Sequence, residues 1–383
     1  MKLNIIISLV LIARFCEAQS LFERALMISQ DVICLQYSAE EIVGMETSNE
    51  MDNNGIKCLI ITTSTSGLED ISVYPNLECL NIYLGDHRKL SIHSRMLPTR
   101  LKYLFVHNIQ RPTKLTFKKI DSIDSLRVFS ADQIVFATLP EFLYSCHNLE
   151  GLFVFLKDTG SINMQKVCNL KKLKHLYLFF DSNVILFDSS VYSLFDLEEL
   201  IIFSSESPRK PIVIDNRIGN LRYLKSIGLE VESIPDEFWN LRNIEHIEIV
   251  SKQPVYIDER VGQMKNLKYW SLNASHFPDS FFTLKELESF YNSDTIFNIC
   301  QYDFSVFPNL TTLSFYQLND STINTISKLK GIRYLYVDKF SVNDMDKIKD
   351  LHFIERIQVR EEIGIEKHRL ILQKQYQGRA ESQ

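Results

Sequence analysis

The chain has 383 residues, of which 45% are hydrophobic, so it is long enough to bury a large core. Its formal net charge is −6 and no block of like charge occurs, which argues against a nucleic acid as the partner. The low numbers of glycine (12) and proline (10) argue against a long flexible linker.

The N-terminal sequence MKLNIIISLVLIARFCEAQS is typical of a signal peptide. Lys2 supplies a positive charge, residues 3–13 form a short apolar run, and Cys16 and Ala18 place small residues before a cleavage site. We therefore expect residues 1–18 to be removed and the protein to be exported, to the periplasm, the cell surface or the medium. A buried N-terminal helix or strand is the alternative reading. The run is too short for a membrane anchor and no later segment is apolar enough, so we expect no stable membrane insertion.

A six-residue pattern recurs along most of the chain, with an apolar residue at its first, fourth and sixth positions. Residues 19–55 are expected to hold an N-terminal cap and the first strand, where VICLQY begins the series at residue 32. About 14 repeats of 20–27 residues then fill residues 56–359, and residues 360–383 are expected to form a C-terminal cap and tail. Examples of the pattern are IKCLII (56), LKYLFV (101), LKHLYL (173), IEHIEI (244) and IERIQV (354).

Each match ends in an alternation of apolar residues, which predicts a strand with one buried face. The segments between matches, such as IPDEFWNLRNIEHI at 234–247, begin with proline and place apolar residues three or four apart. This spacing predicts a short helical or 3₁₀ return.

These repeats resemble the leucine-rich repeat (LRR) family, in particular its exported bacterial members, whose repeats read LP..I..L..L..L.L. The resemblance covers about residues 32–359. It implies an α/β solenoid, a leucine-rich repeat horseshoe with a parallel β-sheet on the concave face and short helices or 3₁₀ turns on the convex face. Because such repeats share one continuous core, we predict a single solenoid domain with caps.

The sequence departs from the family pattern in one respect. The family places an asparagine three positions beyond the last apolar residue of the strand, where its amide bonds the backbone of adjacent turns, and most repeats here lack it. Other groups must therefore satisfy the backbone of these turns. The equivalent positions include Asp181, Ser205, Glu232, Lys252, Ser275 and Thr295.

The strand register assigns alternate residues to the concave face. On three consecutive strands these residues are large and apolar, and we call this set the aromatic strip. We expect it to expose a few hundred Å², the scale of an interaction site, although cross-strand stacking that only stabilises the sheet is the alternative. The strip comprises Phe153, Phe155, Tyr177, Phe179, Ile201 and Phe203, and Tyr103, Phe105 and His175 lie on the same face.

A second set, which we call the tyrosine patch, occupies concave positions nearer the C-terminus. Tyrosine is common at interfaces and in carbohydrate contacts. The ordinary preference of tyrosine for strands is the alternative, and the sequence pattern favours it. The patch comprises Tyr269, Tyr291, Tyr316, Tyr334 and Tyr336.

Three cysteines, Cys34, Cys58 and Cys79, share one concave column on successive strands. Adjacent strands lie about 4.8 Å apart, so one pair could form a disulfide. Free thiols beneath the N-terminal cap are the favoured alternative. We expect no metal, because no CxxC or Cys/His spacing is present. Cys146 replaces a core leucine of its return segment and is predicted to be a small buried hydrophobe.

No catalytic pattern is found: HExxH, GxSxG, a phosphate-binding glycine loop and a dinucleotide fingerprint are all missing from the sequence. We therefore predict a non-enzymatic protein with no cofactor. The first hypothesis is an exported module that binds a protein or peptide, or less favourably a glycan, through its concave face. The second is a structural envelope solenoid without a specific ligand. The fold alone does not separate the two.

Overall fold

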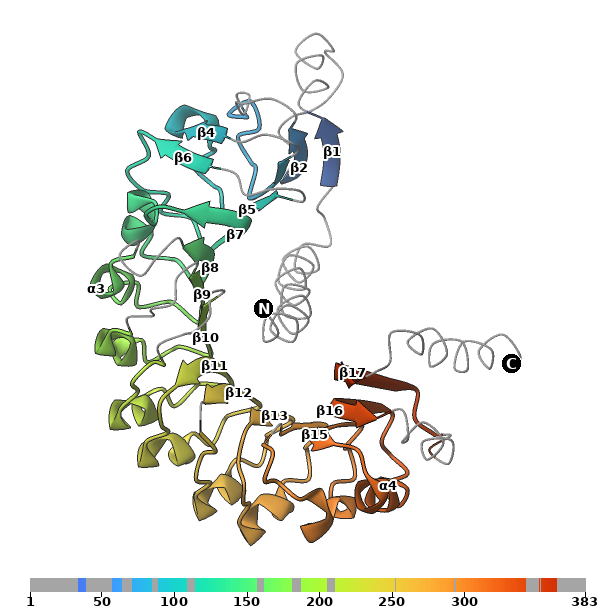
Figure 1. Cartoon of the computed structure of the whole chain (residues 1–383). Helices are drawn as coiled ribbons and strands as arrows, with labels where there is room; N and C mark the ends of the chain where they lie inside the picture. Colours follow the sequence, from blue (N-terminus) through green and yellow to red (C-terminus); the bar gives the residue numbers. More distant parts are fainter. Residues whose placement is uncertain are drawn as a thin grey trace. The chain divides into compact units, whose positions relative to one another are not determined.

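The computed structural model in Figure 1 describes twelve stretches of the chain, and the predicted signal peptide lies outside them. The described residues are 34–38, 57–63, 71–84, 89–108, 114–156, 162–180, 187–204, 211–251, 253–292, 294–341, 351 and 353–363.

Within these stretches, fifteen strands form one sheet whose hydrogen-bonded neighbours follow one another in chain order, and two more strands form a separate pair. The strand pairs whose register is described run parallel. The contacts divide the chain into two compact units, unit 1 with residues 1–197 and 201–210, and unit 2 with residues 198–200 and 211–383.

The strands of unit 1 are β1 (Cys34–Ser38), β2 (Cys58–Thr63), β3 (Cys79–Leu84), β5 (Tyr103–Asn108), β7 (Val128–Phe136), β8 (Gly151–Leu156) and β9 (His175–Phe180), with β4 (Lys89–His93) paired to β6 (Lys114–Lys118). Strand β10 (Glu199–Ser204) has residues in both units. Unit 2 continues with β11 (Ser226–Val231), β12 (His246–Ser251), β13 (Tyr269–Leu272), β14 (Ser289–Tyr291), β15 (Thr312–Gln317), β16 (Tyr334–Ser341) and β17 (Arg356–Ile363). Every match of the six-residue pattern corresponds to one of the fifteen strands of the main sheet, which confirms that prediction.

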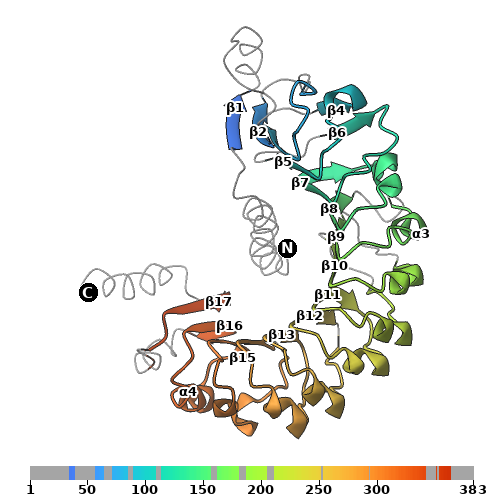
Figure 2. The ribbon, with the colours of Figure 1, turned by 180° about the vertical axis from the view of Figure 1, so that it is seen from behind.

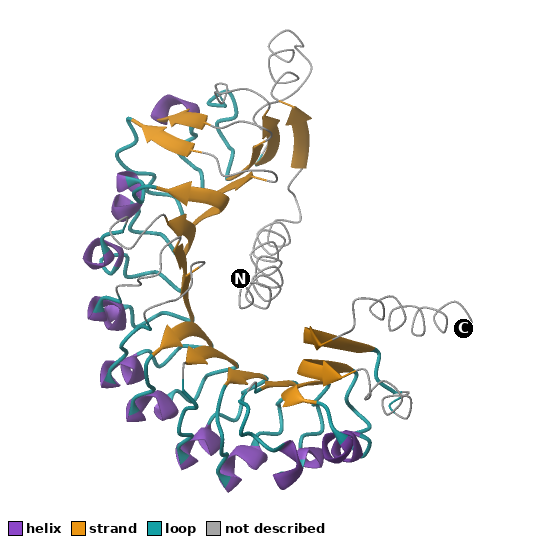
Figure 3. Ribbon diagram, in the orientation of Figure 1, coloured by secondary structure: helices purple, strands orange, loops and turns teal. Residues whose placement is uncertain are grey.

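Short helical turns connect the strands and lie on the other side of each unit from the sheet (Figures 2 and 3). Two are α-helical, α3 (Met164–Val167) and α4 (Asp320–Ile326). The 3₁₀ turns are η2 (Ser94–Met96), η3 (Glu141–Ser145), η5 (Ser189–Ser193), η6 (Asn216–Asn220), η7 (Asp236–Asn240), η8 (Glu259–Gln263), η9 (Asp279–Thr283), η10 (Ile299–Gln301) and η11 (Phe304–Val306). The predicted 3₁₀ return and its position after proline are confirmed, since Pro235 precedes η7 and Pro278 precedes η9.

Where a turn does not begin after proline, a polar side chain accepts from one of its first N–H groups, with η2 as the exception. The Asp215 carboxylate accepts from the N–H of Arg217 at 2.9 Å, and Asp258 accepts from the N–H of Arg260 at 2.8 Å. Each arginine also pairs with its own aspartate, which holds the pKa of the two carboxyls below their usual range. Apart from η2, the described turns therefore start either after a proline, whose φ is fixed, or with a side-chain cap.

The core lies between the sheet and the turns. In β9, Leu176 and Leu178 are fully buried, as the alternation predicts. In unit 2 the core is aromatic, and the Phe277 ring has the ring centroids of Phe281, Phe290 and Phe297 within 4.6 to 5.5 Å. We call the face of the sheet that does not carry the core the open face.

Backbone hydrogen bonds replace the asparagine of the family pattern at Glu232. The N–H of Ile212 donates to the carbonyl of Glu230 at 2.7 Å, and the N–H of Glu232 donates back to Ile212 at 3.1 Å. Asparagines at other positions do bond the backbone of the preceding repeat. The buried Asn292 side chain donates to the carbonyl of Ala274 at 2.6 Å, and Asn148, Asn243 and Asn309 donate to the carbonyls of Asp124, Arg222 and Lys285. The turns are thus satisfied by main chain as well as by side chains.

The residue directly before a strand is often charged, and on neighbouring strands these residues form a row of ion pairs. The sequence analysis did not identify this row. In unit 2 the charge at this position alternates along Glu198, Lys225, Glu245, Lys268 and Glu288. The Lys225 Nζ lies 2.6 Å from Glu198, and the Lys268 Nζ lies 3.0 Å from Glu245. In unit 1 the same position pairs Lys102 with Glu78 at 2.7 Å. These pairs are partly exposed, so each contributes at most about 1 kcal/mol.

Candidate binding surface

The aromatic strip lies on the open face of unit 1, where the register places its side chains side by side. Phe153 is the Cα partner of Tyr177, and Phe155 is the partner of Phe179. The ring centroids are 4.6 Å apart in the first pair and 5.9 Å in the second. The expected direction of these residues is therefore confirmed, and they stack across the strands.

The expected exposure of the strip is wrong for the full-length chain. Phe153, Tyr177, Phe179, Ile201 and Phe203 are each between 2% and 5% exposed, and Phe155 is half-buried. Part of this burial has a local cause, because each stacked ring covers one face of its partner and excludes solvent from it. Whether the strip binds a partner stays a prediction.

A glycine makes room for the strip. A Cβ added at Gly151 would lie 2.9 Å from Cε2 of Phe153, closer than ordinary van der Waals contact. The ring of Phe153 therefore lies over the backbone of its own strand. A larger residue at position 151 would push the ring away from Tyr177.

The other predicted residues of the open face in unit 1 are Phe105, Tyr103 and His175. Phe105 is 2% exposed and packs with Cys58 and Cys79, with Tyr103 partly buried against them. His175 begins β9 and is half-buried.

The register of β1, β2 and β3 places Cys34 beside Cys58 and Cys58 beside Cys79, which confirms the predicted column. The side chain of Cys34 lies outside the described residues, and Cys79 carries a free, buried thiol. The disulfide stays a prediction. Cys146 is fully buried, and burial raises the pKa of its thiol to about 11, as suits the small hydrophobe that was predicted.

Three residues of unit 1 that the sequence analysis did not select, Asn81, Tyr83 and His107, form a polar group on the open face. The His107 ring stacks on Tyr83 with centroids 5.1 Å apart, and burial lowers the pKa of His107 to about 4. The Asn81 side chain, 1% exposed, donates to the Tyr83 hydroxyl at 3.4 Å, while its Oδ1 lacks a hydrogen-bond partner. The low pKa keeps His107 neutral at physiological pH.

The tyrosine patch occupies the open face of unit 2, on β13 to β16. The ring centroids of Tyr269 and Tyr291 are 5.2 Å apart, and those of Tyr291 and Tyr336 are 5.3 Å apart. Tyr291 on β14 and Tyr336 on β16 meet across the strand between them, β15. This contact is possible because the β15 residue in register with both is the small Ser314. His246 extends the row by stacking on Tyr269 at 5.6 Å.

All five tyrosines of the patch are half-buried, so each keeps part of its ring in contact with solvent. Tyr316 already contacts a cation, since the Nζ of Lys339 lies 5.0 Å from its ring centroid. The patch therefore offers more accessible aromatic surface than the strip, in which only Phe155 is half-buried.

Carboxylates lie on the same face as the patch. Glu248 on β12 is 7% exposed and is the register partner of Ser271, which in turn is the partner of Tyr291. Burial raises the pKa of Tyr291 far above its usual range, and the neighbouring tyrosines and the negative charge of Glu248 add to this effect. Glu230 on β11 and Asp338 on β16 are also buried. The β12 side of the patch is therefore negative, whereas Lys339 contacts Tyr316 and Arg356 is the register partner of Tyr334 at the β16 side.

One comparison with a solved structure bears on the fold. A leucine-rich repeat protein from Leptospira interrogans superposes with a TM-score of 0.51 at 18% sequence identity, over 88% of this chain and 98% of that chain. The chain has the leucine-rich repeat fold. An internalin from Listeria monocytogenes gives a TM-score of 0.47 at 14% identity, over 85% of this chain and 94% of that one. No protein-family model and no curated protein matches the sequence.

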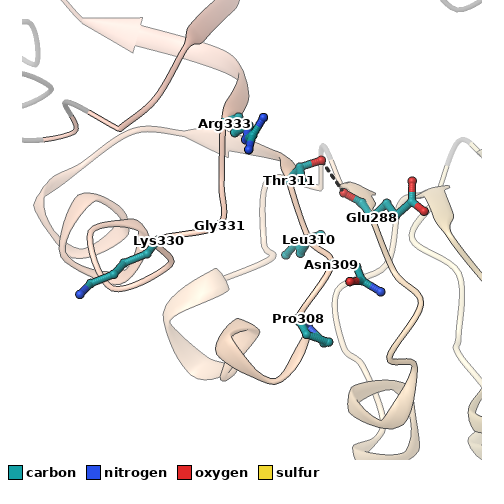
Figure 4. Close-up of a pocket in the computed structure, with 8 residues that line it drawn as sticks. All are labelled: Glu288, Pro308, Asn309, Leu310, Thr311, Lys330, Gly331 and Arg333. Atoms are coloured by element: carbon teal, nitrogen blue, oxygen red, sulfur yellow. Dashed lines mark hydrogen bonds between the residues drawn. The ribbon is translucent and has the colours of Figure 1, made fainter.

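A hollow of about 550 Å³ lies in unit 2, at the edge of the sheet where the strands begin (Figure 4). Thr311 occupies the ion-pair row there and carries no charge; its hydroxyl donates to the carbonyl of Glu288 at 3.3 Å. The hollow is lined by Glu288, Pro308, Asn309, Leu310, Thr311, Lys330, Gly331 and Arg333. Its charged side chains are exposed and have both signs, which gives no catalytic arrangement.

Within the twelve described stretches, no three histidine, cysteine, aspartate or glutamate side chains come together as a metal site would require. In the same stretches no helix has the length and the hydropathy needed to cross a membrane. The open faces of the two units are therefore the candidate surfaces that the repeat fold leaves for a ligand.

Proposed function

We propose that this leucine-rich repeat protein is an exported, non-enzymatic module that binds a protein or peptide through the open face of its sheet. The tyrosine patch is the main contact surface. The observation that carries the proposal is the partial exposure of five tyrosines on one face of four consecutive strands, three of which, Tyr269, Tyr291 and Tyr336, stack in a row. Half-exposed aromatic side chains are enriched at interfaces, where they contribute a large contact area at a low cost in conformational entropy.

The aromatic strip takes second place in the proposal. Apart from the half-buried Phe155, its side chains and Phe105 are each at most 5% exposed, so they have little surface to offer a partner. The stacking of Phe153 on Tyr177 fits the structural alternative, in which the strip stabilises the sheet.

The proposal is tested by affinity capture with the mature chain, residues 19–383, from extracts of the source organism and of its surroundings. The patch variant is Tyr291→Ser/Tyr336→Ser, because serine already occupies the same column at Ser271 and Ser314. The matched control changes two tyrosines of unit 2 that are 60% and 80% exposed and do not belong to the patch, Tyr223→Ser/Tyr256→Ser.

A protein or peptide that the wild type and the control retain, and that the patch variant loses, supports the proposal. Circular dichroism must show all three chains equally folded. Capture of the same material by the patch variant, or no specific capture by any chain, contradicts the proposal and favours a structural role. Release of the captured material by glycosidase treatment would identify a glycan as the partner instead.

A further inference from the structure

We infer that the tyrosine patch takes a cationic side chain, the guanidinium or ammonium group of an arginine or lysine in an extended peptide. This inference rests on the proposed function and names the chemistry of the partner. It comes from the faces of the stacked rings, from the carboxylates beside them and from the length of the patch.

The rings supply the first part of the site. Tyr269, Tyr291 and Tyr336 form a continuous row in which each centroid lies 5.2 to 5.3 Å from the next. The face of an aromatic ring attracts a cation within about 6 Å of its centroid. The same sheet already shows one such contact, since Lys339 lies 5.0 Å from the centroid of Tyr316. A cation from a partner would use the remaining exposed parts of the rings in the same way.

The charges supply the second part. The open-face positions of β11 to β15 carry the carboxylates of Glu230 and Glu248 and no lysine or arginine. Basic groups lie only at the other end of the patch, where Lys339 contacts Tyr316 and Arg356 on β17 is the register partner of Tyr334. Both carboxylates are more than 90% buried, which strengthens their field relative to exposed groups. The negative charge of Glu248 reaches the phenol of Tyr291, so it also acts on a group placed against that ring. A cation gains from this field, whereas an acidic peptide or a phosphate is repelled.

The dimensions favour an extended peptide over a free small cation. The patch spans β13 to β16, and three spacings of about 4.8 Å give a length of about 14 Å. An extended chain advances about 3.3 Å per residue, so about four residues cover the patch. Such a segment places two alternate side chains on the rings. The expected motif therefore has basic residues at positions i and i+2.

The first experiment measures fluorescence anisotropy of a labelled peptide with three arginines separated by single glycines. A second peptide carries citrulline in place of each arginine, which keeps the shape and removes the charge. The protein is the mature chain at low ionic strength. We expect the arginine peptide to bind at least tenfold more tightly than the citrulline peptide. This comparison needs no variant, so a misfolded mutant cannot obscure it.

Variants then locate the site. Glu248→Gln keeps the shape of the side chain and removes its charge, and it should weaken binding of the arginine peptide about tenfold. Tyr291→Ser should weaken binding by about three- to tenfold. Tyr256→Ser, which alters an exposed tyrosine outside the patch, should leave binding unchanged.

Equal binding of the arginine and citrulline peptides overturns the inference. So does binding that is the same in the wild type, Glu248→Gln and Tyr291→Ser, because the peptide would then respond only to the net negative charge of the protein. The failure of the inference differs from the failure of the proposed function. If Tyr291→Ser/Tyr336→Ser loses a captured partner while Glu248→Gln retains it at wild-type strength, the patch binds partners but not through a cation.

Discussion

The substitution Gly262→Ala tests how tightly the turns of neighbouring repeats pack in unit 2. Gly262 lies in η8, and its backbone is outside the left-handed region, so alanine can adopt its conformation. An added Cβ would lie 2.7 Å from the Cβ of Ser280 and 2.9 Å from its carbonyl oxygen, in the next turn, η9. Real Cβ atoms do not approach other atoms this closely, and the backbone carbonyl cannot move aside as a flexible side chain can.

Two effects oppose each other in this variant. Replacing glycine by alanine reduces the entropy of the unfolded chain and stabilises the fold by about 0.4–1 kcal/mol. Overpacking against Ser280 costs about 1–3 kcal/mol. The clash is therefore expected to win, with a net loss of about 1–2 kcal/mol in the free energy of unfolding. Gly219 provides the matched control, because its Cβ would meet Glu237 at 3.1 Å and the two effects should nearly cancel.

The assay is urea-induced unfolding followed by circular dichroism for the wild type, Gly262→Ala and Gly219→Ala. The expected order of midpoints places Gly262→Ala below both other chains. A Gly262→Ala midpoint at or above that of the wild type would show that η8 and η9 are not in the close contact described. A midpoint of Gly219→Ala below that of Gly262→Ala would refute the use of these distances to rank the two sites.

Three further predictions concern charge, pH and the core. The Lys268 Nζ and the Glu245 carboxylate are 3.0 Å apart and partly exposed, so a double-mutant cycle should give a coupling free energy below about 1 kcal/mol that disappears at about 1 M salt. A larger coupling free energy that does not depend on salt would contradict this prediction. Burial lowers the pKa of His107 from 6.5 to about 4, so the unfolded chain binds this proton more tightly than the folded chain does. The free energy of unfolding should therefore be highest above pH 6.5 and fall by up to about 3 kcal/mol as the pH is lowered to 4. His107→Gln should flatten that part of the pH profile of urea midpoints, and equal slopes in both chains would count against the prediction. Phe277→Ala should cost about 3–5 kcal/mol in urea unfolding, whereas Tyr256→Ala should change stability by less than about 0.5 kcal/mol; similar values for the two would place Phe277 outside the core.

The ion-pair row was present in the sequence as the second residue of each six-residue pattern, for example Glu245 in IEHIEI and Lys268 in LKYWSL. Each charge alone looks like an ordinary solvated residue. Only the parallel register brings Glu245 and Lys268, 23 residues apart, to 3.0 Å. A reading of the pattern column by column could therefore have found the row.

The aromatic surfaces show the limit of such a reading. Strand alternation predicted correctly that Phe153 and Tyr177 share one face and that Tyr291 lies on the open face of its own strand. It did not predict that the first two are buried and that Tyr291 keeps part of its surface. Nor could it show that Ser314 allows the rings of Tyr291 and Tyr336 to meet across a strand.

The sequence by itself determined the repeat, the strands, the identity of the core leucines and the start of each turn. These features depend on residues within one repeat, such as Leu176 and Leu178 in β9 or the proline and aspartate that begin the turns. The tertiary structure decided the exposure of the open face, the stacking of its rings and the field around Tyr291. These properties depend on atoms that lie far apart in the sequence, and both burial and electrostatic energy are set by everything that surrounds a side chain rather than by its neighbours along the chain.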